Sequence, residues 1–303
     1  MQGHTPSRVK PYVVTVRVGL VRELWRYPVK SMRGEQIERA EVQPHYGIPG
    51  DRGWAVREES VGEIRSAKKI PALLQCAASY LAEPVGSDTP AVEITLPHGA
   101  RVRSDDPAVH ARLSTTLERP VTLWPRVAAE DTAHYRRREP IDEAEMRRQY
   151  GLARDEPLPD SSSSSATRRT HFTQFVSPLG TYFDAYELHL LTSTAIDGLR
   201  SRHPDAGVDV RRFRPNMVID TSDAPGDHPE FAWVGRRIRI GGLVAEVVVR
   251  MQRCAMIVHE QAELPRDRTV LRTLVRETGH TLGVAASVVQ PGLVAIGDLV
   301  ELI

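Results

Sequence analysis

Apolar and polar residues alternate over short stretches along most of the chain, which is the pattern of β-strands. Frequent β-branched apolar residues predict a first strand over residues 13–26. Short runs of the same kind, separated by turns rich in glycine and proline, predict further strands. In the first half these strands cover 37–42, 54–57, 73–80, 92–96, 101–103 and 121–124.

Helical periodicity is confined to a few segments in the sequence. The predicted helices cover 108–117, 195–202 and 270–278, and the second of these follows hydroxyl residues suited to cap a helix. The second half otherwise predicts strands at 217–219, 236–240, 245–250 and 256–259, and a strand–turn–strand over 285–303. Since strands and helices do not alternate regularly, we expect a β-rich α+β fold that contains barrels.

One segment departs from this pattern. Residues 126–175 are strongly polar, with arginine clusters at 136–138 and 147–148 and an unbroken serine run from Ser161 to Ser165. Such a composition buries little apolar surface, so it predicts a mobile linker or insertion. A lid over a substrate site is the alternative interpretation.

Composition narrows the class of protein. Lys and Arg total 40 and Asp and Glu total 39, so a net charge of +1 gives no overall attraction to nucleic acid or to an anionic membrane. The start of the chain lacks the apolar core of a signal peptide, and no apolar run is long enough to span a bilayer. With only Cys76 and Cys254 present, a disulfide framework is not expected either. We therefore expect a cytoplasmic protein.

The sequence lacks the motifs of several common nucleotide-binding, catalytic and metal-binding sites. The sequence has no G-x-G-x-x-G, no phosphate-binding G-x-x-x-x-G-K-[ST] loop, no G-x-S-x-G and no H-E-x-x-H. It also has no C-x-x-C, which argues against a structural zinc site or an iron–sulfur cluster.

The remaining candidates are anion-binding groups and one cysteine. Lys30, Ser31 and Arg52 could together bind an oxyanion, and Thr192 and Ser193 at a helix start could do the same. Each has an ordinary alternative, namely a surface cation or a helix cap. Arg214 precedes a proline, which restricts its backbone, but it could equally be a surface arginine that ends a strand.

Cys254 follows Gln252 and Arg253 between two predicted strands. A neighbouring cation favours the thiolate, which is the form that binds metals, although a buried and inert cysteine is as good an interpretation from composition alone. Cys76 lies among small and apolar residues, so we expect it in the core.

Taken in order, these motifs resemble the MOSC family, the proteins related to the C-terminal domain of molybdenum cofactor sulfurases. The N-terminal half is similar to the β-barrel domain that accompanies it, on the evidence of 24–31 (LWRYPVKS) and 50–52 (GDR). The C-terminal half is similar to the MOSC domain, on 212–216 (RFRPN), 253–254 (RC) and 297–298 (GD). The resemblance implies an N-terminal extension (1–20), a MOSC N-terminal β-barrel domain (21–125), the linker or insertion (126–175) and a MOSC domain with a pyruvate-kinase-like barrel (176–303).

The resemblance also implies a cofactor and its ligands. In the reducing members, which include the mitochondrial amidoxime-reducing component, the cysteine of the Arg-Cys motif ligates molybdenum, and Cys254 occupies that position. The positions that would hold the pterin and its phosphate are Lys30, Ser31, Arg52, Arg214, Gln252 and Arg253, with Thr192 and Ser193 matching more loosely. The cofactor implied is Mo-molybdopterin.

Two functions follow from this resemblance. The first is an oxidoreductase that reduces small N-hydroxylated or N-oxygenated compounds, with electrons from a separate flavoprotein or iron–sulfur protein, since the chain has no cysteines for a cluster of its own. The second is a non-catalytic carrier of the cofactor, or of a persulfide on Cys254 received from a sulfur donor.

Overall fold

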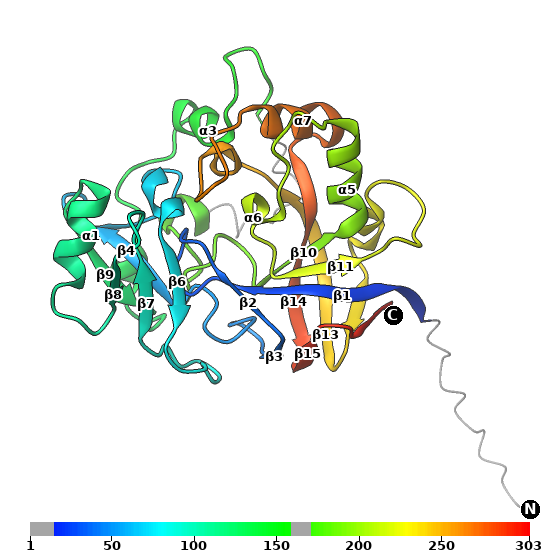
Figure 1. The fold of residues 1–303 in the computed structure, drawn as a ribbon, viewed down its shortest axis with the longest axis horizontal. Helices are drawn as coiled ribbons and strands as arrows, with labels where there is room; N and C mark the ends of the chain where they lie inside the picture. Colours follow the sequence, from blue (N-terminus) through cyan, green and yellow to red (C-terminus); the bar gives the residue numbers. More distant parts are fainter. Residues whose placement is uncertain (1–14, 159–170) are drawn as a thin grey trace, which may run out of the picture.

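A computed structural model describes residues 15–158 and 171–303. Its largest sheet closes on itself, because the first strand pairs antiparallel with two different strands of the C-terminal half. In Figure 1 this first strand crosses the C-terminal part of the molecule. The strands of the closed barrel, in spatial order, are β11 (Met217–Asp220), β10 (Leu188–Thr192), β14 (Thr281–Gln290), β13 (Leu243–Gln252), β12 (Arg237–Ile240), β16 (Leu299–Leu302) and β1 (Val16–Arg26).

The N-terminal half consists of smaller sheets beside the barrel (Figure 1). One contains β5 (Glu63–Arg65), β4 (Trp54–Glu58) and β9 (Val121–Pro125), and another contains β6 (Ala77–Tyr80), β7 (Val92–Thr95) and β8 (Arg101–Arg103). Two short strands tie this half to the barrel. β2 (Glu35–Ile37) pairs with β1, and β3 (Arg39–Val42) pairs with β15 (Gly292–Ala295).

Helices cover the outside of these sheets. α1 (Val109–Leu117) packs on β9, α5 (Ser193–Arg202) packs on β10 and β11, and α7 (Thr269–Thr278) packs on β14. The shorter helices are α2 (Thr132–Tyr135), α3 (Glu143–Tyr150), α6 (Val210–Phe213), and the 3₁₀ helices η1 (Pro71–Gln75), η2 (Pro229–Trp233) and η3 (Ala255–Val258). In the described part of the chain, no helix is long and apolar enough to cross a membrane.

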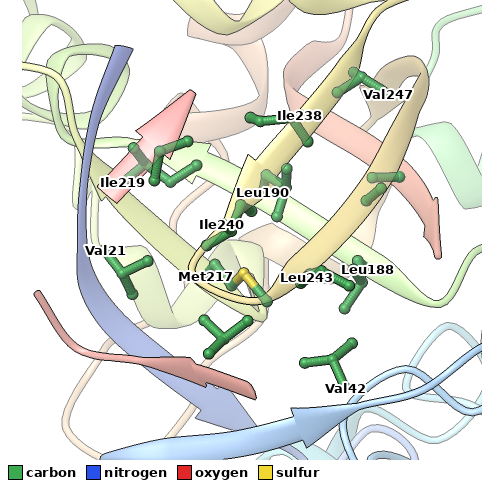
Figure 2. Packing of buried hydrophobic residues seen from close by; sticks show 14 of the residues in the cluster. Val21, Val42, Leu188, Leu190, Met217, Ile219, Ile238, Ile240, Leu243 and Val247 are labelled. Atoms are coloured by element: carbon green, nitrogen blue, oxygen red, sulfur yellow. The ribbon is translucent and has the colours of Figure 1, made fainter. Parts of the chain in front are cut away.

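The barrel interior is a packed apolar core. Inward-facing residues of its strands interdigitate, among them Val21, Leu190, Met217 and Ile238, each at most 1% exposed (Figure 2). A separate core fills the N-terminal half and includes Cys76, which is fully buried as expected. Burial raises the pKa of the Cys76 thiol to about 11, so this cysteine stays protonated and unreactive.

The predicted β-rich α+β class with barrels is confirmed, and two local predictions are wrong. Residues 256–259 lie mainly in η3 rather than in a strand, and the first part of 73–80 lies in η1. Both runs are short and apolar, and periodicity cannot distinguish a strand from a buried turn of helix over so few residues. Residues 126–158, expected within the mobile linker, contain α2 and α3, whereas Ser161–Ser165 lie outside the described residues.

Candidate cofactor site

The site begins where β1 leaves the barrel. After Arg26 the chain bridges to the N-terminal sheets, where Val29 pairs with Trp54. Tyr27 is held at this junction by a hydrogen bond from its amide to Asp51 Oδ1 (2.8 Å) and by one from its hydroxyl to the Pro215 carbonyl (3.0 Å). Tyr27 therefore sits between the two halves with its ring fixed in place.

Two guanidinium groups lie over the Tyr27 ring. The Cζ of Arg214 is 4.1 Å and that of Arg52 is 4.7 Å from the ring centroid. Arg214 also donates from Nη1 to the Met32 carbonyl at 2.6 Å, and Arg52 pairs with Asp51. Cations favour aromatic faces, so the ring allows two like charges to approach each other.

Three of the candidate residues have left-handed backbones. Ser31, Arg52 and Arg214 have φ of 68°, 49° and 54°. A residue with a side chain is strained in this region, so the surrounding structure must hold it there. Such strain is common at binding sites, where it fixes the direction of a functional side chain.

Lys30 contacts Asp184, an acidic residue that was not identified from the sequence. Its Nζ donates to the Tyr182 carbonyl at 2.8 Å and to Asp184 Oδ1 at 2.5 Å. Lys30 is buried, whereas the Asp184 side chain is 59% exposed. Desolvation by the surrounding protein would raise the pKa of Asp184, but Lys30 and Lys68 hold it well below its usual range, so the carboxylate is ionised.

The Asp184 carboxylate lies close enough to several cations of the site to affect their pKa values. Each of them interacts electrostatically with this carboxylate, and together they form what we call the cationic cluster: Lys30, Arg52, Lys68, Arg214 and Arg253. The carboxylates that face the cluster, Asp184 and Asp51, do not balance it. Its excess positive charge suits a multiply charged anion such as a phosphate.

Cys254 lies beside this cluster, between the end of β13 and the start of η3. It is half-buried and packs against the core of Ala67, Leu74 and Met256. Arg253 is buried next to it and donates to the Phe213 carbonyl at 2.6 Å. Burial lowers the pKa of Lys68, but the charges of Cys254 and Asp184 more than compensate, so the pKa of Lys68 lies above its usual value.

Two donors of the cluster lack an acceptor. Arg214 Nη2 and Arg253 Nε are buried, and neither has a hydrogen-bond partner among the described residues. Burial lowers the pKa of both arginines, and Arg52 lowers that of Arg214 further, to about 10. Buried donors are rarely left without partners in folded proteins, so this arrangement fits a site that is completed by a bound anion.

The two hydroxyl candidates are engaged elsewhere. Thr192 Oγ1 caps α5 by accepting from the Ala195 amide and donates to Glu230 at 2.7 Å. Ser193 Oγ donates to Asp220 at 3.2 Å. Hydroxyls that already face carboxylates are poorly placed to bind a phosphate. The helix-cap alternative describes the contacts of Thr192, whereas Ser193 joins the start of α5 to the end of β11.

Ser31 and Gln252 lie next to the cluster in different ways. Ser31 Oγ accepts from the Ala67 amide at 2.9 Å. This hydrogen bond joins the loop that carries Lys30 to the segment that carries Lys68. Gln252 Oε1 accepts from the Tyr150 hydroxyl at 3.4 Å.

Sequence reasoning missed Tyr27, Lys68 and Asp184 as members of this site. Tyr27 stands inside the Tyr-Pro-Val-Lys-Ser motif, so the motif itself carried that signal. Lys68 and Asp184 sit in unremarkable surroundings, and only the fold brings them to Lys30 and Cys254. Among the described residues, no group of three or more His, Cys, Asp or Glu side chains is placed to hold a metal.

Comparison with known proteins finds distant relatives of this chain. Mitochondrial amidoxime-reducing component 1 from Mus musculus is 25% identical over 243 residues, which are 79% of this chain and 65% of that protein. This chain thus spans less than two thirds of that relative. Among solved structures, the YuaD protein from Bacillus subtilis is 12% identical with a TM-score of 0.44, and covers 95% of this chain and 96% of its own. YiiM from Geobacillus stearothermophilus is 18% identical with a TM-score of 0.29, and covers 39% of this chain and 54% of its own.

The family matches divide the chain into two parts. Residues 18–127 match the MOSC N-terminal beta barrel domain, and residues 168–301 match the MOSC domain. The cationic cluster draws on both matches, since Lys30, Arg52 and Lys68 fall in the first and Arg214 and Arg253 in the second. The chain therefore carries both of these domains, an N-terminal β-barrel domain followed by the MOSC domain.

Proposed function

We propose that this chain binds the molybdenum cofactor, with Cys254 as the protein ligand of the metal and the cationic cluster as the binding site of the pterin phosphate. The observation that carries the proposal is the position of an accessible thiol beside an unbalanced cluster of cations with two unfilled buried donors. A soft thiolate suits a high-valent metal whose other sulfur ligands come from the cofactor.

The residues present fit such a group. Arg214 and Arg253 would donate to phosphate oxygens through the nitrogens that lack partners, and Lys30 and Arg52 would add charge. Lys68, next to both Cys254 and Asp184, would neutralise negative charge close to the thiolate. Thr192 and Ser193 are left out of this site because they contact acids.

The proposed reaction is the reduction of N-hydroxylated or N-oxygenated compounds. An N-hydroxyl group takes up two electrons and two protons, the N–O bond breaks, and an amine-type nitrogen and water result. The cofactor, when bound, would supply the two-electron chemistry, with electrons from a separate flavoprotein or iron–sulfur protein. Asp184, which is ionised, paired with Lys30 and partly exposed, would orient a positively charged amidine-type substrate and accept its hydrogen bonds.

The test is metal and pterin analysis of protein purified from a host that makes the cofactor. We expect close to one molybdenum and one pterin per chain in the wild type and loss of molybdenum in Cys254→Ala. Cys76→Ala is the matched control, since that thiol is fully buried and should leave the metal content unchanged. Equal molybdenum in the Cys254→Ala protein would refute the ligand assignment.

A second candidate is a carrier of the cofactor or of a persulfide, with a sulfur donor as partner. The half-buried position of Cys254 beside Lys68 and Arg253 favours it, because cations stabilise the anion of a thiol or persulfide. A protein that purifies without molybdenum but with a persulfide on Cys254 would support the sulfur carrier. Stoichiometric cofactor without turnover by any reductant would support the cofactor carrier.

A further inference from the structure

Helix α3 lies in the polar segment between the two family matches, and it is anchored to the candidate site. Asp142 Oδ1 caps it by accepting from the Glu145 amide at 2.7 Å, and the helix ends at Gly151, whose φ is 65°. Glu145 forms an ion pair with Lys69 Nζ at 2.8 Å. Since Lys69 follows Lys68 in the sequence, this pair ties α3 to the segment that supplies a cation of the cluster.

The anchoring carboxylate is ionised at all ordinary pH values. Burial alone would raise the pKa of Glu145, but hydrogen bonds from Gln149, Lys69 and Arg148 lower it to about 2. A second acid of the same segment, Glu139, pairs with Arg65 at 3.1 Å. The segment is thus attached to the N-terminal half at more than one point.

The C-terminal end of α3, at Tyr150 and Gly151, lies close to the chain on both sides of Cys254. The Tyr150 hydroxyl donates to Gln252 Oε1 at 3.4 Å, two residues before the cysteine. A Cβ at the next position, Gly151, would lie 3.8 Å from the Cβ of Ala255, one residue after the cysteine. α3 also packs against η3, which begins at Ala255 (Figure 1). The end of α3, which carries Tyr150, therefore lies across the stretch of chain that presents the thiol.

The ring of Tyr150 also has an aromatic neighbour. It meets the ring of His280 edge-on, with the centroids 6.3 Å apart. The phenol interacts electrostatically with Lys68, Cys254 and Asp184, so it lies near the cationic cluster and the thiol. Burial is the main reason that the pKa of Tyr150 is raised, which keeps its hydroxyl protonated and able to donate a hydrogen bond.

We infer that Tyr150 is a specificity-determining residue: its ring forms a wall over Cys254 that admits small or flat molecules and excludes bulky ones. This inference rests on the proposed function for its substrates, which would be planar N-hydroxylated compounds that can lie along an aromatic face. The hydroxyl would donate to the oxygen of the N–O group once the substrate displaces its long hydrogen bond to Gln252.

The first test needs neither cofactor nor turnover. In the cofactor-free protein, Cys254 is alkylated with iodoacetamide, which is small, and with N-pyrenylmaleimide, which is bulky, and peptide mass mapping separates its labelling from that of Cys76. We expect Tyr150→Ala to speed the bulky reagent by about tenfold relative to the small one, the scale on which a pocket discriminates by size. Tyr150→Phe should leave both rates unchanged.

Two further variants keep this test decisive. Gln149→Ala is the matched control, because Gln149 is the neighbouring residue of the same helix and its side-chain amide donates to Glu145 at 2.9 Å. It should change neither rate. Tyr150→Trp enlarges the wall and should slow the bulky reagent, so it decides the matter if Tyr150→Ala fails to fold. Parallel changes for both reagents in every Tyr150 variant would overturn the inference.

The second test uses the cofactor-loaded protein. Tyr150→Ala should lower KM for bulky N-hydroxylated substrates more than for small ones, and Tyr150→Phe should lower kcat with little change in KM for either. One outcome is that the alkylation test shows size selection by Tyr150 while the wild type has no reductase activity. That outcome would refute the proposed reductase function and support the steric role of Tyr150. Reductase activity that does not depend on substrate size in any variant would refute the steric role of Tyr150 and support the proposed reductase function.

Discussion

Replacing Arg214 with methionine should change the stability of the cofactor-free protein very little, although this arginine is buried. Burial and the nearby Arg52 lower the pKa of Arg214 from the ordinary 12.5 to about 10. For a base, a lowered pKa means that the folded state disfavours the charged form. At neutral pH, the folded protein therefore carries an unfavourable charge, which it could lose only as the pH rises through 10.

The magnitude follows from the same contacts. The lowered pKa corresponds to about 3 kcal/mol of unfavourable free energy at neutral pH, which methionine removes. The substitution also removes the hydrogen bond to the Met32 carbonyl and the stacking on Tyr27, together worth about 2 to 4 kcal/mol. The two effects nearly cancel, so the free energy of unfolding should change by less than about 1.5 kcal/mol.

Arg212 provides the matched control. It is also buried, two residues away, but it donates to the carbonyls of Gly207, Ile257, His259 and Pro265. Burial also lowers the pKa of Arg212, but Arg212→Met removes four hydrogen bonds at about 1 kcal/mol each, so it should cost clearly more than Arg214→Met.

Urea denaturation of the cofactor-free proteins at pH 7 measures both values. Added inorganic phosphate should stabilise the wild type, by mass action, and should stabilise Arg214→Met less. A loss of 3 kcal/mol or more in cofactor-free Arg214→Met would refute the reasoning, because it would show that the arginine serves the fold rather than an anion.

Two other predictions concern the same region. Burial, with the charge of Arg253, lowers the pKa of His189 to about 3, so the unfolded chain takes up a proton below the ordinary pKa of 6.5 while the folded protein does not. The free energy of unfolding should therefore fall by about 1.4 kcal/mol per pH unit as the pH drops from 6.5 towards 3. Urea unfolding at pH 7 and at pH 5 measures this fall. Between these two pH values, His189→Gln should lose about 2 kcal/mol less stability than the wild type. An unchanged pH dependence in that variant would contradict this. At Gly283, φ is 74° and a Cβ would lie 2.6 Å from the Leu190 carbonyl oxygen, so Gly283→Ala should cost about 3 kcal/mol or more in thermal unfolding. Gly279→Ala should cost about 1 kcal/mol, since its φ is 58° but a Cβ there meets no described atom within 4 Å; equal losses would contradict the role of the close contact.

The strands and the fold class could be predicted because alternation along a half-buried strand is a local property. Most predicted strands and the three longer helices lie close to their observed ranges. The helices within 126–158 could not be predicted in the same way. In α3, Glu145 pairs with Lys69, which is far away in the sequence, and a segment of charged residues looks unstructured until such a partner is known.

The candidate site, too, depends in part on contacts between residues that are far apart in the sequence. Lys30 and Cys254 lie in motifs that a resemblance can identify. Asp184 and Tyr150 have no motif, and their relation to Cys254 depends on how the halves of the chain meet. Hydroxyls at 192 and 193 suggest an anion site in the sequence, but a helix start offers the same signal, and their carboxylate neighbours become visible only in the fold.

The path of β1 constrains how the molecule can assemble. Its pairing with β16 joins residues 16–20 to residues 299–302, which are separated by nearly the whole chain. Contacts between residues so far apart in the sequence form late in folding, because the entropy of closing so long a loop must be overcome before the strand pairing adds stability. Until then β11 and β16 present unpaired edges, which are sites of aggregation. A fragment cut at the family boundary, at residue 168, would keep those edges open permanently, so the two matched regions are separable in sequence but not as folding units.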